Sequence, residues 1–265
     1  MPKIKVDGVN LYYEVHGEGF PLLMIQGLSE NVYWWDPPLI EKLSKHFMMV
    51  LFDNRGVGRS DELEGDISIE LMASDALGLL DSINIDEAHI LGHSLGGMVA
   101  QEIALKFPER INKLVLCSTS CGGSKAELPP IETQRLLGKF SMRKHTRALT
   151  EEGMTHIFTK KFLNENPEFM KKKVDEILIV PTGPTTFKAQ MGAWMRYNSC
   201  RKLKNVNIPT LIMHGKEDIL VPPSNSELLG EKIPNAKVVY FEANAHIIHT
   251  EEPDKFIEVL LKFLK

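Results

Sequence analysis

The segment Gly92-His93-Ser94-Leu95-Gly96-Gly97 decides the fold of this chain. It directly follows an apolar run at residues 88–91, which predicts a buried strand, and apolar residues at helical spacing come after it. A serine in so tight a strand-to-helix turn takes a strained backbone conformation, and side chains at positions 92 and 96 would collide there, so both positions need glycine. The segment is therefore interpreted as the G-x-S-x-G turn that presents a nucleophilic serine above a sheet. A glycine-rich turn with an incidental serine is the alternative.

Short apolar runs alternate with helical patterns on both sides of this turn. The predicted strands are a hairpin over residues 2–16 that turns at Asp7-Gly8, followed by the runs 21–25, 47–52, 88–91, 113–117, 208–213 and 237–241. Continuous apolar runs suit strands that are buried on both faces, and residues 69–83 repeat with helical spacing. The pattern predicts an α/β protein with a mostly parallel, doubly wound sheet and helices on both faces.

Strand character stops near Cys121 and resumes only after residue 205. The residues between these points read as helices separated by proline and glycine. We predict a helical cap over residues 122–205, inserted into a core that residues 1–121 and 206–265 form. Charge supports this division, because residues 125–204 carry a net charge of +8 and the rest of the chain carries −12.

The composition limits the classes of function. The 265 residues are 43% hydrophobic and 25% charged, as in an ordinary soluble globular protein. No stretch approaches 18 consecutive apolar residues and the first residues alternate like a strand, so we expect no membrane span and a cytoplasmic location. Cys117, Cys121 and Cys200 cannot all pair within one chain and match no zinc spacing, so neither a disulfide scaffold nor a metal site is expected. A net charge of −4 gives no reason to expect nucleic acid, and 23 lysines against eight arginines, with four glutamines, lean weakly toward a thermostable protein.

A serine hydroxyl needs a base that removes its proton and an acid that orients the base. His246 lies just after the last predicted strand, and Asp218 lies in the equivalent loop after the preceding strand. These loops lie at the edge where an open α/β sheet places its site. We predict a triad of Ser94, Asp218 and His246, in the chain order Ser-Asp-His. His249 is the alternative base and Glu217 the alternative acid, and solvated loop residues are the explanation without function.

These features resemble the α/β-hydrolase superfamily, and in particular its cap-bearing serine esterases, over essentially the whole chain. Further matching residues are Gly17-Glu18-Gly19, the stretch 53–61, and His246 followed by Glu251 and Pro253. The resemblance implies an eight-stranded, mostly parallel sheet flanked by helices, with the cap inserted after the sixth strand. Haloalkane dehalogenases and soluble epoxide hydrolases share the fold but use an aspartate as the nucleophile, so Ser94 excludes them.

Two backbone N–H groups are expected to bind the oxyanion. Ser94 precedes a predicted helix, so the Leu95 N–H at the start of that helix is one donor. In the family the second donor follows a His-Gly pair after the third strand, and the resemblance therefore implies Leu28 in Gln26-Gly27-Leu28. Gln26 departs from the family histidine and alters the support of the loop, and Ala245 replaces the glycine that usually precedes the catalytic histidine.

Three tryptophans are candidate walls of the substrate pocket. Trp34 and Trp35 follow the expected oxyanion loop, and Trp194 lies in the cap among several methionines and phenylalanines. Such an adaptable apolar lining suits short or medium acyl chains. Packing within the core or between cap helices is the alternative for all three.

Basic residues in the cap motivate a further hypothesis. Lys139, Arg143, Lys144 and Arg147 could hold an anionic part of a substrate, such as the phosphates of an acyl-CoA or a carboxylate tail. Solvated helix faces explain the same residues, and we favour that explanation.

The sequence therefore predicts a serine carboxylesterase that hydrolyses short- to medium-chain acyl esters through an acyl-enzyme, with no cofactor and no metal. A thioesterase, an enol-lactonase or a carbon–carbon bond hydrolase on the same triad is the alternative within hydrolases. A ligand-binding receptor with very slow turnover is the alternative from another class. The expected partner is a small acyl ester, and the sequence leaves the oligomeric state open.

Overall fold

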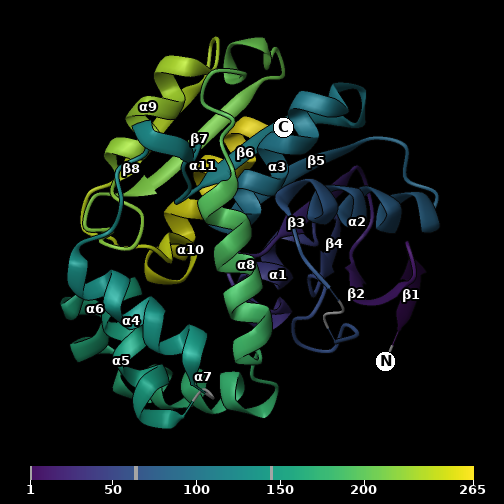
Figure 1. Ribbon diagram of the computed structural model, residues 1–265. Helices are drawn as coiled ribbons and strands as arrows, with labels where there is room; N and C mark the ends of the chain where they lie inside the picture. Colours follow the sequence, from purple (N-terminus) through teal and green to yellow (C-terminus); the bar gives the residue numbers. More distant parts are fainter. Residues whose placement is uncertain (1, 63–64, 144–145) are drawn as a thin grey trace.

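The structure, a computed structural model, describes residues 2–62, 65–143 and 146–265 (Figure 1). In these ranges eight strands form one sheet in the order β1-β2-β4-β3-β5-β6-β7-β8. The β1/β2 and β2/β4 pairs are antiparallel and the other neighbours are parallel, so the predicted mostly parallel sheet is confirmed. The strands are β1 Lys3–Val6, β2 Val9–His16, β3 Pro21–Ile25, β4 Met48–Phe52, β5 Ala88–His93, β6 Ile111–Cys117, β7 Thr210–Gly215 and β8 Lys237–Phe241.

Helices cover both faces of the sheet. The helices of the core are α1 Pro37–Leu43, α2 Ile69–Ser82, α3 Leu95–Lys106, α9 Ser224–Lys232, α10 Ile248–Glu251 and α11 Pro253–Leu264. In the described residues, no helix is both long enough and apolar enough to cross a membrane.

Successive residues of the central strands point into two separate cores. In β3, Leu23 and Ile25 pack with residues of α2, α3 and α9, whereas Leu22 and Met24 pack with residues of α1 and α11. Side chains alternate across a strand, so a strand buried on both faces needs an apolar residue at every position. This requirement explains the continuous apolar runs from which the strands were predicted.

A helical insert separates β6 from β7, as the resemblance implies. Its helices are α4 Ile131–Met142, α5 Arg147–Ile157, α6 Lys160–Glu165, α7 Pro167–Ile179 and α8 Pro184–Arg196. Figure 1 shows α4 to α7 gathered away from the sheet, with α8 leading the chain back toward it. The two ends of the insert meet at an antiparallel bridge between Gly122 and Asn198. We call the segment between β6 and β7 the cap, and its treatment as a separate domain over residues 122–205 stays a prediction.

Some element boundaries differ from the sequence prediction. β5 continues past residue 91 to His93, because His93 still pairs with Cys117 in the strand ladder. β7 spans residues 210–215 rather than 208–213. Backbone pairing sets these ends, whereas the prediction followed the apolar run alone. The short helices α1, α9 and α10, of seven, nine and four residues, were not predicted because they offer too few turns for a period to show.

Candidate active site

Ser94 occupies the turn between β5 and α3 in a strained conformation, with φ 53° and ψ −120°. A Cβ at position 92 would lie 2.3 Å from the Gly96 carbonyl oxygen, and one at position 96 would lie 2.2 Å from the Ile25 carbonyl oxygen. Only glycine therefore fits beside this serine. A residue held in such a region costs roughly 1–3 kcal/mol, and the hydrogen bond from Ser94 N–H to the Cys117 carbonyl, at 2.9 Å, helps to hold it there.

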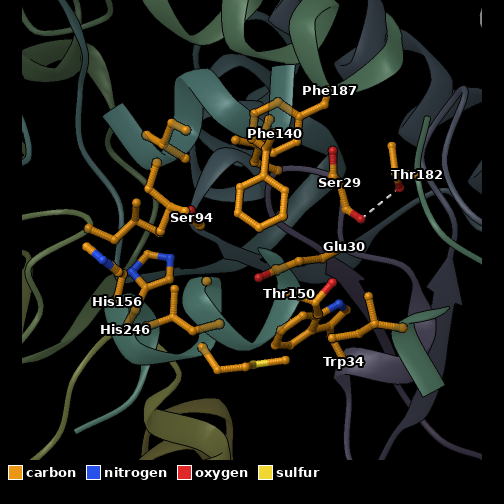
Figure 2. Close-up of a pocket in the computed structure, with 18 of the residues that line it drawn as sticks. Ser29, Glu30, Trp34, Ser94, Phe140, Thr150, His156, Thr182, Phe187 and His246 are labelled. Carbon is orange, nitrogen blue, oxygen red and sulfur yellow. Dashed lines mark hydrogen bonds between the residues drawn. The ribbon is translucent and has the colours of Figure 1, made fainter. Parts of the chain in front are cut away.

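His246 and Asp218, which follow β8 and β7, are in direct contact. His246 Nδ1 lies 2.7 Å from Asp218 Oδ2, and both side chains are buried. Nδ1 therefore donates to the carboxylate, and Nε2 is left as the basic nitrogen. Among the described residues Nε2 has no hydrogen-bond partner. His246 and Ser94 line the same cavity (Figure 2), so the structure brings the predicted nucleophile, base and acid to one place.

The Asp218 carboxylate accepts four hydrogen bonds. Oδ1 accepts from the N–H groups of Leu220 and Val221, both at 2.8 Å, and Oδ2 accepts from His246 and from His214 Nε2 at 3.0 Å. Burial by itself raises the pKa of Asp218, but the charge of His246 and the hydrogen bonds from both histidines outweigh it, so the pKa lies well below its usual range. The carboxylate stays ionised and can stabilise a positive charge on His246.

His214 is a supporting residue that sequence reasoning missed. Its Nε2 lies 3.0 Å from Asp218 Oδ2 and 2.8 Å from the Val221 carbonyl oxygen. Both are acceptors, so Nε2 carries the hydrogen, and the Ser226 hydroxyl donates to Nδ1 at 2.5 Å. The sequence signal was a histidine four residues before the predicted acid, but it does not reveal that the loop after β7 turns back onto this side chain.

The two alternative residues lie elsewhere. His249 is buried against Trp35, with ring centroids 4.8 Å apart, and its Nε2 lies 3.2 Å from the Trp34 carbonyl oxygen. Glu217 is exposed. Neither takes the position that His246 and Asp218 hold.

Leu28 and Leu95, whose N–H groups are the expected oxyanion donors, lie at the same cavities as Ser94. Leu28 lines the main cavity with Ser94, and both leucines line a smaller adjoining cavity with it. The hydrogen bonds of the described residues give neither N–H an acceptor. Leu95 is the first residue of α3, where a helix leaves its N–H groups free. The assignment of the Leu28 and Leu95 N–H groups to an oxyanion hole stays a prediction.

A buried ion pair supports the loop that carries Leu28. Glu30 Oε2 accepts a hydrogen bond from Gly27 N–H at 3.0 Å and lies 3.0 Å from His93 Nδ1. Burial raises the pKa of Glu30 and lowers that of His93, but the attraction between them reverses both effects: the pKa of Glu30 lies below, and that of His93 above, its ordinary value. Sequence reasoning missed this pair, because its members are 63 positions apart.

The cap holds the same loop from the other side. Ser29 N–H donates to Gln190 Oε1 of α8 at 2.7 Å. The Thr182 hydroxyl donates to the Ser29 carbonyl at 2.9 Å, the contact drawn as a dashed line in Figure 2. The cap also holds the loop of His246, whose N–H donates to the Ile157 carbonyl at the end of α5 at 3.0 Å. The position of the predicted base therefore depends on a carbonyl of the cap.

Two of the three candidate tryptophans lie at cavities. Trp34 lines the main cavity (Figure 2), and Trp194 lines the adjoining one. Trp35 lines neither of these cavities, so its prediction as a pocket residue is wrong. It is 1% exposed and packs in the core that α1 and α11 cover, with its ring against that of His249.

The basic residues of the cap do not converge on the cavity. Lys139 pairs with Glu152 at 2.5 Å, and Arg147 pairs with Asp175. Arg143 is exposed, and Lys144 lies outside the described residues. Among the described residues that line the main cavity there is no lysine or arginine. The described ranges also contain no group of three or more His, Cys, Asp or Glu side chains placed to hold a metal ion.

Comparisons with known proteins agree with the observed fold. A family model for the alpha/beta hydrolase fold matches residues 21–253. Among curated proteins, the putative carbamate hydrolase RutD of Azorhizobium caulinodans is 29% identical over 263 residues, which cover 99% of this chain and 98% of that protein.

Solved structures give similar matches. The enol-lactonase from Burkholderia xenovorans LB400 superposes with a TM-score of 0.89 at 25% identity, covering 99% of each chain. A mutant form of the meta-cleavage product hydrolase CumD from Pseudomonas fluorescens IP01, complexed with acetates, superposes with a TM-score of 0.86 at 26% identity, covering all of this chain and 97% of that one. The three relatives are named for different substrates: a carbamate, an enol-lactone and a meta-cleavage product.

Proposed function

Because this chain belongs to the alpha/beta hydrolase fold family, we propose that it is a serine hydrolase that cleaves uncharged carboxylic esters with short to medium acyl chains. The observation that carries the proposal is the 2.7 Å contact between His246 Nδ1 and Asp218 Oδ2 beside the cavity that Ser94 lines. This arrangement supplies a nucleophile, a base and an orienting acid.

The first half of the reaction forms an acyl-enzyme. Ser94 Oγ attacks the ester carbonyl carbon while His246 Nε2 takes its proton, and Asp218 stabilises the resulting imidazolium. The negative charge that develops on the carbonyl oxygen is met by the N–H groups of Leu28 and Leu95. His246 then returns the proton to the departing alkoxide, and the alcohol leaves.

The second half releases the acid. A water molecule attacks the acyl carbon of the ester on Ser94 and gives its proton to His246 Nε2. The tetrahedral intermediate collapses, and Ser94 Oγ recovers a proton from His246. Each step uses only residues of this chain and water.

The lining of the main cavity supports an uncharged substrate. Apart from Ser94, His246 and a few polar groups, its wall consists of aliphatic and aromatic residues such as Trp34, Leu136, Met154 and Phe187. The Glu30 carboxylate also borders it and is already paired with His93. The described residues of this lining include no lysine or arginine, and the apolar side chains among them favour burial of an uncharged substrate.

Carbamate hydrolysis is a second candidate. It is supported by the match to the RutD protein, named as a carbamate hydrolase, over nearly the whole length of both chains. The same triad would attack the carbamate carbonyl and form a carbamoyl-enzyme. The Burkholderia relative is named for an enol-lactone. A lactone is a cyclic ester, so lactone hydrolysis belongs with the first proposal.

The test compares hydrolysis of p-nitrophenyl esters of two to twelve carbons, and of a p-nitrophenyl carbamate, by the wild type and Ser94→Ala. Rapid ester turnover that disappears in Ser94→Ala supports the esterase, and faster carbamate turnover supports the second candidate. Activity that survives Ser94→Ala would overturn the mechanism. No turnover of any substrate would overturn the proposed activity and favour a ligand-binding receptor.

A further inference from the structure

One histidine of the cap lines the main cavity without belonging to the predicted triad. His156 lies near the end of α5 and lines the cavity together with Ser94 and His246 (Figure 2). Its Nδ1 lies 2.9 Å from Oγ1 of Thr133, a buried residue of α4. Two cap helices therefore cooperate to fix one imidazole against the cavity.

The Thr133 hydroxyl settles which nitrogen of His156 carries the proton. Its contact with His156 Nδ1 is the one hydrogen bond that this side chain makes within the described residues. If Nδ1–H were the donor, the hydroxyl hydrogen of Thr133 would be buried without an acceptor, which costs about 1–3 kcal/mol. The Thr133 hydroxyl therefore donates to Nδ1, and in neutral His156 the hydrogen is on Nε2.

His156 is neutral at ordinary pH. Burial lowers its pKa by more than the charges of Glu152 and Glu132 raise it, and the charge of Lys139 lowers it further. Its Nε2–H makes no hydrogen bond to the described part of the chain. It is thus an uncharged donor that remains free for a ligand.

The other polar side chains that the described part of the cap contributes to this wall already have hydrogen-bond partners. The Thr150 hydroxyl donates to the Thr146 carbonyl at 2.9 Å, within its own helix. The Thr182 hydroxyl donates to the Ser29 carbonyl at 2.9 Å. Among the described cap residues of this wall, His156 is therefore the polar side chain with a donor to offer.

The cavity also contains His246, which returns the proton to the leaving group in the proposed function. The adjoining cavity is lined by Ser94, Leu28 and Leu95 but not by His246, so the proposed function places the acyl part of the substrate there and the leaving-group part in the main cavity. We propose that His156, held by Thr133, forms a subsite that donates a hydrogen bond from Nε2 to an uncharged acceptor oxygen, such as an ether or carbonyl oxygen, on the alcohol portion of the substrate. This inference rests on the proposed function.

The experiment uses two esters of equal length that differ by one atom, n-butyl butanoate and 2-methoxyethyl butanoate. The ether oxygen of the second ester replaces a methylene group of the first. The ratio of their kcat/KM values is measured for the wild type, His156→Phe, His156→Gln and Thr133→Val. Thr150→Val is the matched control, because it removes a hydroxyl from the same wall that its own helix already uses.

The wild type is expected to prefer the methoxyethyl ester by about fivefold to tenfold, the worth of one hydrogen bond to a neutral group. His156→Phe abolishes this preference and Thr133→Val weakens it, whereas His156→Gln, which keeps a donor, and Thr150→Val retain it. A change confined to overall activity, with the ratio intact in His156→Phe, would show a merely structural role and overturn the subsite.

A measurement of binding tests the His156 subsite independently of the proposed function. In a Ser94→Ala background, the ratio of Kd for the two esters is measured with and without His156→Phe by titration calorimetry. Absence of turnover in the wild type would count against the proposed function alone, because the Kd ratio still tests the subsite. Equal affinity for both esters with His156 intact would overturn the subsite even if both esters are hydrolysed.

Discussion

In the proposed mechanism Asp218 acts on Ser94 through His246, so a substitution of Asp218 tests the triad at the scale of single residues. In Asp218→Asn, the amide cannot accept two histidine hydrogen bonds and stabilise an imidazolium as the carboxylate does. We expect kcat to fall by roughly 10³- to 10⁴-fold, with KM changed little. Steady-state kinetics with a p-nitrophenyl ester measures the loss. Glu217→Gln, at the exposed neighbouring position, is the control and keeps full activity; an Asp218→Asn protein that keeps most of its kcat would contradict the assignment of the acid.

The Glu30–His93 pair predicts how stability depends on pH. The pKa of His93 is raised in the folded protein, so its contribution to stability is fully present below about pH 6.5, the unfolded value, and is lost as pH rises through the folded pKa. The pKa of Glu30 is lowered, so its contribution is present above about pH 4.3 and is lost as pH falls further. We expect the Tm advantage of the wild type over Glu30→Gln to be largest near pH 5–6 and to shrink above neutrality.

Thermal unfolding followed by circular dichroism between pH 4 and pH 9 measures this advantage. Glu242→Gln is the control, because it removes an ion pair with Lys216 in which the Lys216 and Glu242 side chains are 47% and 71% exposed, and it shows no such pH dependence. A difference in Tm between the wild type and Glu30→Gln that stays constant with pH would mean that Glu30 and His93 do not form a titrating ion pair.

The sequence could identify residues whose role depends on local context, and it missed those whose role depends on distant partners. Ser94 was found because its glycines and its place between strand and helix are contiguous. His214, Glu30 and His156 were missed because their partners come from loops or helices that only the fold brings near. Trp35 shows the opposite error: an aromatic residue beside the site belongs to the core, since backbone direction and not sequence distance decides where its side chain goes.

At the scale of elements, the close approach of α3 to β3 predicts that Gly96 cannot be replaced. A Cβ at this position would lie 2.2 Å from the Ile25 carbonyl oxygen and 2.7 Å from that of Gln26. Because both neighbours are backbone atoms, relief requires the helix to move, and Gly96→Ala should cost about 3 kcal/mol or more in free energy of unfolding. Urea denaturation measures this cost.

Gly138 in α4 is the matched control. A Cβ there meets no atom of the described residues within 4 Å, so Gly138→Ala should stabilise the protein by about 0.5–1 kcal/mol through helix propensity. Equal effects of the two substitutions would mean that the turn is not as tightly packed as the distances indicate.

The periodicity of the sequence predicted which segments are helices and strands, but it did not predict the residues at which they end. The continuous apolar runs revealed the central strands because both faces of the sheet are covered. The last residues of β5 and β7 are polar or glycine and extend the strands because the neighbouring strand offers partners, which a single stretch of sequence does not display. The cap helices were expected as a group, but α4 could not be placed beside α5 from sequence.

At the scale of the whole molecule, a buried lysine joins the cap to the core. Lys173 of α7 is 3% exposed, and its Nζ lies 2.8 Å from Asp36 Oδ1 and 2.9 Å from the Tyr33 carbonyl oxygen. Lys173→Met leaves Asp36 without its charged partner and should lower the free energy of unfolding by about 3 kcal/mol. We also expect KM to rise more than kcat falls, because the cap wall of the cavity loses its anchor.

Urea denaturation and steady-state kinetics check both effects. Lys172→Met is the control. The Lys172 side chain is 74% exposed and its Nζ lies 3.7 Å from Glu176 Oε1, and an exposed ion pair of this kind contributes little to stability. A Lys173→Met protein as stable as this control would show that the apolar contacts of the cap hold it without the ion pair.

The hydrogen bond from His246 N–H to the Ile157 carbonyl has a consequence for engineering by recombination. Caps are attractive units to exchange among relatives when a new substrate range is wanted, on the assumption that the core keeps its chemistry. In this protein a cap taken from a relative would have to place a carbonyl where that of Ile157 lies. It would also need a residue that replaces Thr159, whose N–H and hydroxyl donate hydrogen bonds to Glu251. In a chimaera whose crossover lies between residues 157 and 159, Ile157 and Thr159 come from different parents, so the two contacts are not inherited together. Productive junctions therefore lie outside this segment, close to the bridge between Gly122 and Asn198.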